Sequence, residues 1–321
     1  MRAVVYEGTG GLDAVRFQER PDPMPGSNEV LVEASFAGVN TADLAQLAGN
    51  YPPPPDAPQD VPGLEVAGRV VATGSAVRAW KEGDRVFGLV GGGGLADRVV
   101  VHERHVARVP DVLSDEEAAA VPEAFITAHD AVFSQAGLGM GDRLLVTGAN
   151  GGVGTAAVQL GRAAGARVFA AARSDEARGR LAEEFGVEAV DGEDFVGALE
   201  DAGGADVVLE LVGAPNLDRD FDALATKGRI VVVGTGAGAD GEISLRKLMG
   251  KRAQLIGTVL RARPLEQKAA AVQAFAHEVV PLLADGRAKP VIDRVFPAEQ
   301  VTDAFEHMAG RGKFGKVLLA F

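Results

Sequence analysis

The chain has no cysteine among its 321 residues. This absence excludes disulfides, thiolate catalysis and every zinc site that uses sulfur ligands. An excess of positive charge is also lacking: the formal net charge of -13 argues against a nucleic-acid partner or an anionic membrane surface. No stretch approaches the roughly 20 apolar residues that span a bilayer. The polar start MRAVVYEGTGG is unlike a signal peptide. We therefore expect a cytoplasmic protein.

Length and composition indicate a globular protein of two domains. A chain of 321 residues exceeds the usual size of one hydrophobic core. Residues 1 to about 109 contain short strand-like segments between Gly and Pro turns, which predicts a β-rich domain. Within it, residues 51–62 hold six prolines in twelve positions. Each proline ring fixes φ, so this proline-rich loop is expected to be stiff.

The pattern changes after Ser114, which is a good N-cap for a helix running through SDEEAAAVPEAF. Buried strands are predicted at 143–148, 167–172, 205–211 and 229–234, with helices at 152–164, 175–185 and 217–225. This alternation predicts an α/β fold with a doubly wound parallel sheet. The later segments are a strand at 254–259, a helix at 264–284, a strand at 291–296, a helix from 297 to about 308 and a strand at 317–321. We expect the segments after residue 262 to return to the first domain. The first domain then comprises residues 1–119 and 262–321, and the second comprises residues 120–261.

A glycine-rich turn gives the strongest chemical signal. The run from Val146 to Gly154 reads VTGANGGVG, after one predicted strand and at the start of a helix. Ala149, Gly151 and Gly154 fill the three small-residue positions of the dinucleotide fingerprint, with Asn150, Gly152 and Val153 between them. Small residues let the backbone approach a pyrophosphate at the helix N-terminus. The alternative is a glycine-rich turn without a ligand.

The residues after the predicted strand 167–172 determine whether NAD or NADP is preferred. NAD enzymes place a carboxylate there, about 20 residues after the glycines, on the ribose 2′-hydroxyl. Here the chain reads Ala171-Ala172-Arg173-Ser174, so Arg173 and Ser174 offer donors for a 2′-phosphate. NADPH is therefore the predicted cofactor. The alternative makes Arg173 a solvated arginine and lets Asp175 serve NAD. Arg178, one turn on, adds charge or is plain helix surface.

A β-rich domain interrupted by a dinucleotide-binding domain resembles the medium-chain dehydrogenase/reductase superfamily. Its zinc enzymes carry Cys and His ligands where this chain has Asn40, in Gly-Val-Asn, and Leu64, in Pro-Gly-Leu-Glu. The four-cysteine lobe is replaced by residues 91–94. Since those ligands are missing, no metal is expected. His102 and His105 lie close in sequence without further ligands, and we do not expect them to bind one.

Further motifs resemble the zeta-crystallin-like quinone oxidoreductases. These are Gly38-Val39-Asn40 with Ala42-Asp43-Leu44, and Gly49-Asn50-Tyr51 followed by prolines. The segments 121–128 (VPEAFITA) and 260–263 (LRAR) are most similar to the branch of tumour-suppressor-inducible quinone oxidoreductases. The resemblance implies a GroES-like catalytic domain and a Rossmann domain.

The same resemblance implies where several residues act. Asn40 and Tyr51 would line the cleft beside the nicotinamide, Thr127 would lie near its carboxamide, and Gly234, followed by Thr235, would lie near its ribose. Some relatives place a Lys and a Tyr near the 2′-phosphate where this chain has 176–178 (EAR) and 190–192 (VDG). A second cleft tyrosine of some relatives is Ala45 here, which suggests a roomier pocket.

The function these features predict is NADPH-dependent reduction of a quinone or similar conjugated carbonyl by hydride transfer. A quinone is already electrophilic, so the reaction does not need a Lewis acid. Tyr51 is the candidate proton donor and Asn40 the candidate for orienting the carbonyl, although Tyr51 as a packed aromatic and Asn40 as a turn residue remain open. The alternatives are an enoyl or alkenal reductase, or a non-catalytic crystallin-like or RNA-binding protein. The apolar edge segment 254–259 predicts a homodimer.

Overall fold

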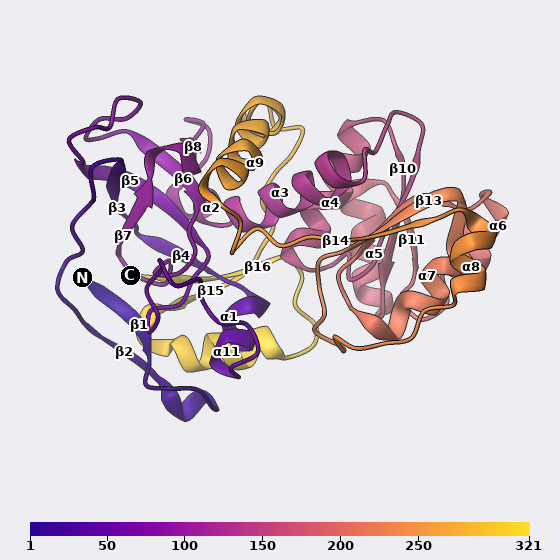
Figure 1. The fold of residues 1–321 in the computed structure, drawn as a ribbon, viewed down its shortest axis with the longest axis horizontal. Helices are drawn as coiled ribbons and strands as arrows, with labels where there is room; N and C mark the ends of the chain where they lie inside the picture. The colour runs from indigo at the N-terminus through magenta and orange to yellow at the C-terminus, as the bar shows by residue number, and fades with distance from the viewer. The chain divides into compact units, whose positions relative to one another are not determined.

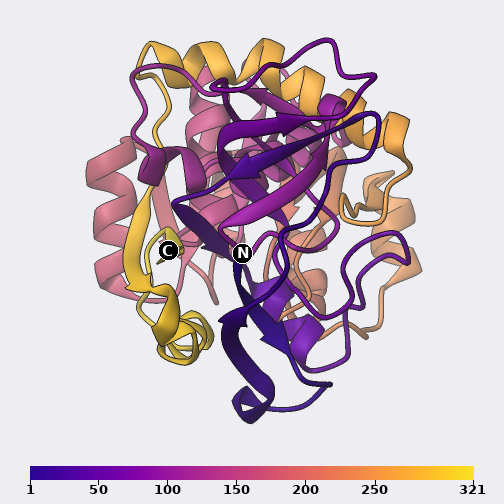
Figure 2. The ribbon, with the colours of Figure 1, turned by 90° about the vertical axis from the view of Figure 1, so that its left-hand side faces the viewer.

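The chain folds into two units, and in the sequence the second interrupts the first. The computed structural model describes all 321 residues. Unit 1 comprises Met1–Ile126 and Leu260–Phe321, and unit 2 comprises Thr127–Val259. Both chain ends belong to unit 1 (Figures 1 and 2). The sequence placed the boundaries near residues 119 and 262. No helix combines the length and apolar character needed to cross a membrane.

The main sheet of unit 1 is antiparallel and holds five strands. Its order is β7-β3-β5-β6-β8. Alternating valines on these strands, such as Val30 and Val32, are fully buried and build one core of the unit. The strands are β3 (Glu29–Glu33), β5 (Glu65–Thr73), β6 (Arg85–Leu89), β7 (Arg98–His102) and β8 (Val106–Arg108).

A second sheet joins the C-terminus to the N-terminal part of unit 1. Strand β16 (Lys316–Ala320) pairs antiparallel with β4 (Phe36–Val39) and parallel with β15 (Ile292–Pro297). A separate hairpin consists of β1 (Arg2–Tyr6) and β2 (Val15–Glu19). Helix α11 (Val301–Ala309) packs Ala304 and Phe305 against these elements in a second core. The C-terminal strand is thereby placed beside the segment that leads to Asn40 (Figure 1).

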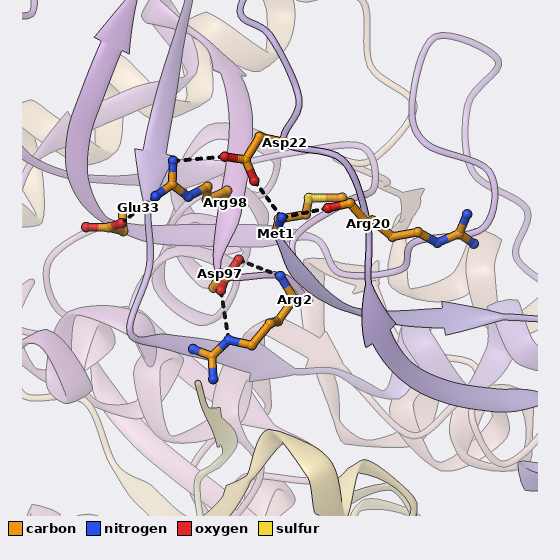
Figure 3. A network of polar contacts seen from close by, with 7 residues as sticks. All are labelled: Met1, Arg2, Arg20, Asp22, Glu33, Asp97 and Arg98. Atoms are coloured by element: carbon orange, nitrogen blue, oxygen red, sulfur yellow. Dashed lines mark hydrogen bonds and ion pairs between the residues drawn. The ribbon is translucent and has the colours of Figure 1, made fainter.

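Ion pairs and hydrogen bonds hold Met1 and Arg2, the first residue of β1, in place. The terminal ammonium of Met1 donates to Asp22 Oδ1 at 2.5 Å and to the Arg20 carbonyl at 2.7 Å. Asp22 also pairs with Arg98 at 3.1 Å, and Arg2 pairs with Asp97 at 3.0 Å. Figure 3 shows this network, which Glu33 completes through Arg98. The contacts tie the hairpin to strand β7.

Prolines divide two helices that the sequence predicted as continuous. The helix after Ser114 is split into α2 (Asp115–Ala119) and α3 (Pro122–His129), and the one expected at 264–284 into α9 (Leu265–Glu278) and α10 (Val280–Ala284). Pro122 and Pro281 lie at helix starts, because proline lacks an N–H and crowds the preceding turn. Short α1 (Thr41–Leu47) was not predicted. Three single turns of 3-10 helix complete unit 1, at Leu12–Ala14, Glu103–His105 and Ala298–Gln300.

Unit 2 confirms the predicted doubly wound α/β fold. Its six strands are all parallel, in the order β11-β10-β9-β12-β13-β14. The strands are β9 (Arg143–Val146), β10 (Arg167–Ala172), β11 (Glu188–Asp191), β12 (Ala205–Glu210), β13 (Leu224–Val232) and β14 (Gln254–Gly257). In chain order this is 3-2-1-4-5-6, the order of dinucleotide-binding sheets.

Helices follow the strands of unit 2 as the alternation predicted. They are α4 (Gly152–Ala163), α5 (Asp175–Phe185), α6 (Val196–Asp201), α7 (Leu217–Ala223) and α8 (Leu245–Lys251), with π-helical turns at Asp130–Gln135 and a 3-10 turn at Ala214–Asn216. Helices α4 and α5 pack on β10, while α7 and α8 pack on β13. Strand β11 and helices α6 and α8 were not predicted from the sequence.

Candidate active site

The glycine-rich turn of unit 2 connects β9 to α4. Gly148 has a φ of +58°, a conformation that glycine adopts without strain. A Cβ on Gly154 would lie 2.5 Å from the Gly148 carbonyl oxygen and 2.6 Å from Ala149 Cα. Glycine at 154 is therefore required by the chain's own packing. A Cβ on Gly151 would meet only the Gly148 oxygen, at 3.5 Å, so packing does not explain that glycine.

The start of α4 is suited to an anionic group. Gly151 is the N-cap and provides no side-chain cap, and the first turn carries no acidic residue. The first N–H groups of a helix have no partner inside the helix, so those of the first turn are available to oxygen acceptors. Ala149 is fully buried and donates its N–H to the Ala171 carbonyl at 3.0 Å, which fixes the turn to β10. These residues fit the pyrophosphate of a dinucleotide.

The end of β10 carries an exposed arginine with no partner. The Arg173 guanidinium makes no hydrogen bond or ion pair within the chain. Ser174 is the N-cap of α5, and its hydroxyl accepts from the Ala177 N–H at 3.2 Å. Asp175 is engaged by Arg178, which also binds Asp191 at 2.8 Å. The Arg173 guanidinium is therefore the free cation at this strand end, and Asp175, two residues further on, is already paired.

Two loops meet at the carboxyl edge of the sheet, beyond β12 and β13. A Cβ on Gly234 would lie 2.2 Å from the Leu211 carbonyl oxygen, so glycine here serves the packing of one loop on the other. Glu210 is fully buried and accepts from the N–H groups of Val212 at 2.5 Å and Gly213 at 2.6 Å. Thr235 follows Gly234 and is exposed. The edge where a nicotinamide ribose is expected is thus held by a buried carboxylate that the sequence did not single out.

The candidate residues of unit 1 include Asn40, whose amide is bound by the chain itself. Its Oδ1 accepts from Lys316 Nζ at 2.6 Å, and its Nδ2 donates to Glu65 Oε1 at 2.9 Å and to the Gly38 carbonyl at 3.3 Å. Its backbone N–H donates to Asp43 Oδ2 at 2.8 Å. A substrate contact by this amide would require the exchange of one of these bonds.

A buried ion pair lies behind Asn40. Lys316 Nζ binds Glu65 Oε1 at 2.6 Å, with both side chains at most 5% exposed. The other oxygen of Glu65 accepts from the Glu123 N–H at 2.9 Å. Burial and the nearby Glu65 charge raise the pKa of Glu123 to about 7. A Cβ on Gly38 would lie 2.1 Å from Glu65 Oε1, which explains the glycine of the Gly-Val-Asn motif.

Tyr51 lies at the start of the proline-rich loop and is held by Arg261. The guanidinium donates to the Tyr51 carbonyl at 2.8 Å, and its carbon lies 5.1 Å from the centre of the Tyr51 ring. Arg261 also binds the Gly91 carbonyl at 2.8 Å and Gln46 Oε1 at 2.5 Å. The Tyr51 hydroxyl makes no hydrogen bond within the chain. Burial, with the charge of Glu123, raises the pKa of Tyr51 to about 12, so the phenol stays protonated at neutral pH.

Thr127, His102 and His105 are the remaining candidate positions. Thr127 lies on α3 and is 7% exposed. The His102 and His105 rings are 5.3 Å apart, and no group of three or more His, Cys, Asp or Glu side chains is arranged to hold a metal ion. Burial lowers the pKa of His105 to about 4.

The sheet order, the glycine turn and the β-rich unit together define a two-unit, nicotinamide-dependent oxidoreductase. Two family models match the chain: an alcohol dehydrogenase GroES-like domain over residues 26–111 and a zinc-binding dehydrogenase domain over residues 152–277. The chain belongs to the medium-chain dehydrogenase/reductase superfamily, in its zeta-crystallin-like quinone oxidoreductase family.

Curated relatives support this membership over nearly the whole chain. Bovine quinone oxidoreductase-like protein 2 is 34% identical, covering 91% of this chain and 85% of its own length. Human quinone oxidoreductase is 32% identical, covering 99% and 97%.

Solved structures share the fold. A quinone oxidoreductase of Pseudomonas syringae has a TM-score of 0.89 at 26% identity, covering 100% of this chain and 99% of its own. A mycobacterial protein complexed with NADPH has a TM-score of 0.90 at 26% identity, covering 100% of both chains. The CurK enoyl reductase has a TM-score of 0.87 at 26% identity, covering 99% and 98%.

Proposed function

We propose that this chain is an NADPH-dependent quinone reductase that works by hydride transfer without a metal. The observation that carries the cofactor choice is the free guanidinium of Arg173 at the end of β10. A 2′-phosphate is a dianionic acceptor that suits such a fork of donors. Asp175, the carboxylate that would serve the 2′-hydroxyl of NAD, is bound to Arg178. The NADPH-bound mycobacterial neighbour is in line with this choice.

The quinone assignment is supported by the names of the relatives and by the chemistry of unit 1. NADPH, when bound, supplies the hydride. The positions of the zinc ligands hold Asn40 and Leu64, and a quinone is electrophilic enough to accept a hydride without a Lewis acid. The reduced oxygen then needs a proton or a hydrogen-bond donor. Tyr51 supplies one, because its hydroxyl is protonated and has no partner in the chain. Asn40 acts as a positioning residue through its bonds to Lys316 and Glu65.

A direct test is steady-state oxidation of NADPH and NADH by the purified, EDTA-treated protein. A 1,2-quinone, a 1,4-quinone and a 2-enoyl thioester are offered separately. Quinone turnover with NADPH preferred, undiminished by EDTA, is the expected result. Turnover of the thioester alone would instead support reduction of a conjugated double bond, the activity in the name of the CurK neighbour. Tight NADPH binding without turnover of any substrate would point to a non-catalytic protein.

The contribution of Tyr51 has its own test. Tyr51→Phe keeps the ring under the Arg261 guanidinium but removes the donor. We expect kcat for the quinone to fall by roughly tenfold or more, with the affinity for NADPH unchanged. Tyr6→Phe is the matched control, because the Tyr6 hydroxyl donates to the Asp43 carbonyl inside the core. Equal kinetics for wild type and Tyr51→Phe would remove Tyr51 from the mechanism.

We also propose a homodimer formed through the edge of the unit 2 sheet. Strand β14 has a single neighbour, β13, and Leu255 is 37% exposed on it. Further exposed apolar side chains come from neighbouring segments: Ile243, Leu245, Met249 and Val259. Such an edge favours pairing with a second copy. Light scattering after gel filtration tests this by measuring the molar mass of the wild type and of Leu255→Asp. A wild type with the mass of a monomer, unchanged in Leu255→Asp, would refute the proposal.

Localisation and partners complete the proposal. We place the protein in the cytoplasm, with a small conjugated carbonyl as its ligand and no nucleic-acid partner, because the net charge of -13 disfavours a polyanion. Fractionation of the source cells and a nucleic-acid binding assay at low salt test both points.

A further inference from the structure

We infer that Arg178 determines the cofactor preference indirectly, as a positioning residue that keeps Arg173 free for the 2′-phosphate. This inference rests on the proposed use of NADPH. Arg178 lies one turn into α5, and its side chain is only 22% exposed. It is not aimed at solvent but back at the end of β10.

Four acceptors converge on the Arg178 guanidinium. Its Nη1 donates to the carbonyl oxygens of Ala172 at 3.0 Å and Arg173 at 2.9 Å, and to Asp191 Oδ2 at 2.8 Å. Its Nη2 binds Asp175 Oδ1. Asp191 ends β11, directly beside Ala172 in the sheet, and its other oxygen accepts from the Glu193 N–H at 2.8 Å. One side chain thus joins the ends of two strands to the first turn of the helix.

This arrangement has two consequences for Arg173. The first is geometric: with the carbonyls of residues 172 and 173 anchored, the backbone that carries the Arg173 side chain is fixed. The second is electrostatic. Asp175 lies two residues after Arg173, and Asp191 is paired in the sheet with Ala172, so both carboxylates compete for the Arg173 guanidinium when they are unoccupied. Because Arg178 binds both, the Arg173 guanidinium has no partner within the chain.

Asp175 also bears on the use of NAD. Its side chain is 96% exposed, so it has room to turn toward a ribose 2′-hydroxyl. The ion pair with Arg178 opposes that movement. Arg178 therefore favours NADPH and disfavours NADH through the same contact. A lysine would not replace it, because a single ammonium has three donors and lacks the planar fork that reaches four acceptors.

The test compares dissociation constants of NADPH and NADH, measured by titration calorimetry on the full chain. The variants are Arg178→Gln, Arg173→Gln and Arg180→Gln. Arg180 provides a matched control, since it is on the same helix and pairs with Glu184 at 2.9 Å. We expect Arg178→Gln to weaken NADPH binding by roughly tenfold or more, the effect of losing charge-assisted hydrogen bonds, and to change NADH binding by less than about threefold. Arg180→Gln should leave the ratio of the NADPH and NADH dissociation constants within about twofold of the wild-type ratio.

The outcomes separate this inference from the proposed function. If Arg173→Gln abolishes the NADPH preference but Arg178→Gln behaves like Arg180→Gln, the role of Arg178 is refuted and the cofactor choice stands. If the wild type prefers NADH, or Arg173→Gln has no effect, the cofactor choice fails and this inference fails with it.

A second variant covers the case in which Arg178→Gln does not fold. Asp175→Asn alters an exposed side chain, and we expect it to leave NADH binding unchanged and NADPH binding equal or tighter. Weaker NADH binding by Asp175→Asn would show that Asp175 contacts the ribose, and would overturn the inference.

Discussion

Replacing Asp220 by Asn should stabilise the protein at alkaline pH and not at acid pH. Asp220 lies on α7, is fully buried, and neither of its carboxyl oxygens accepts a hydrogen bond. Burial and the adjacent carboxylate of Glu210 raise its pKa to about 9. The native state therefore holds Asp220 protonated, with its O–H available to Glu210. In the unfolded chain the same group has the ordinary pKa of 3.8.

The direction in which stability changes with pH follows from the number of protons bound in the native and unfolded states. Between pH 4 and 9 the native state binds a proton that the unfolded state does not, so the contribution of Asp220 is full below about pH 4 and is lost as the pH rises toward 9. Each pH unit in that window corresponds to about 1.4 kcal/mol. From pH 5.5 to 8.5, Asp220→Asn should therefore gain up to about 4 kcal/mol relative to wild type. An Asn amide at this position offers a donor to Glu210 without titrating.

Urea denaturation at the two pH values measures this difference. Asp218→Asn is the matched control, because Asp218 is on the same helix but exposed and paired with Lys247 at 2.6 Å. Only the Asp220 variant should gain free energy of unfolding, relative to wild type, in an amount that grows with pH. A free energy of unfolding that differs from wild type by the same amount at pH 5.5 and 8.5 would refute the protonated carboxyl.

Three further perturbations test other parts of the two units. Glu123→Gln should remove an ionisation near pH 7 from the pH profile of kcat/KM, because the Glu123 carboxyl is neutral below its raised pKa of about 7 and charged above it. Gly154→Ala should weaken NADPH binding by roughly tenfold in calorimetry, since its Cβ would lie 2.5 Å from the Gly148 oxygen and displace the turn. Lys316→Met should cost about 3–5 kcal/mol in chemical denaturation by leaving Glu65 buried without its partner, and adding Glu65→Gln should recover part of that loss.

Where local patterns are decisive, the sequence predicted unit 2 well. Strands β9, β10 and β12 are continuous apolar runs buried on both faces, and each lay where the pattern indicated. Strand β11 was missed because its residues Glu188–Asp191 are only partly buried and do not read as apolar. The helix α1 has seven residues, too few to display a periodic apolar face.

The candidate site shows the same division between local and distant relationships. The places of the glycine turn, between β9 and α4, and of Arg173, directly after β10, could be predicted because a strand, a turn and a helix adjoin in the sequence. The pairs that organise unit 1 were not. Glu65 and Lys316 are 251 residues apart, and Gln46 and Arg261 are 215 apart. No spacing rule links such positions, so only the folded chain reveals that Lys316 binds Asn40 and Glu65 together.

Two arginines, Arg261 and Arg178, make similar sets of contacts. Arg261 binds two carbonyls, one of them that of Tyr51, and an amide oxygen, and its guanidinium lies over the Tyr51 ring. Arg178 binds two carbonyls, one of them that of Arg173, and two carboxylates. In each case the guanidinium binds acceptors around it, while the proposed ligand-binding group beside it, the Tyr51 hydroxyl or the Arg173 guanidinium, has no partner within the chain. Several donors in a rigid plane allow one side chain to fix several backbone segments at once. A group that is to bind a ligand needs a fixed position and a donor that is not already hydrogen-bonded. These arginines fix the backbone beside such a group and leave its donor free.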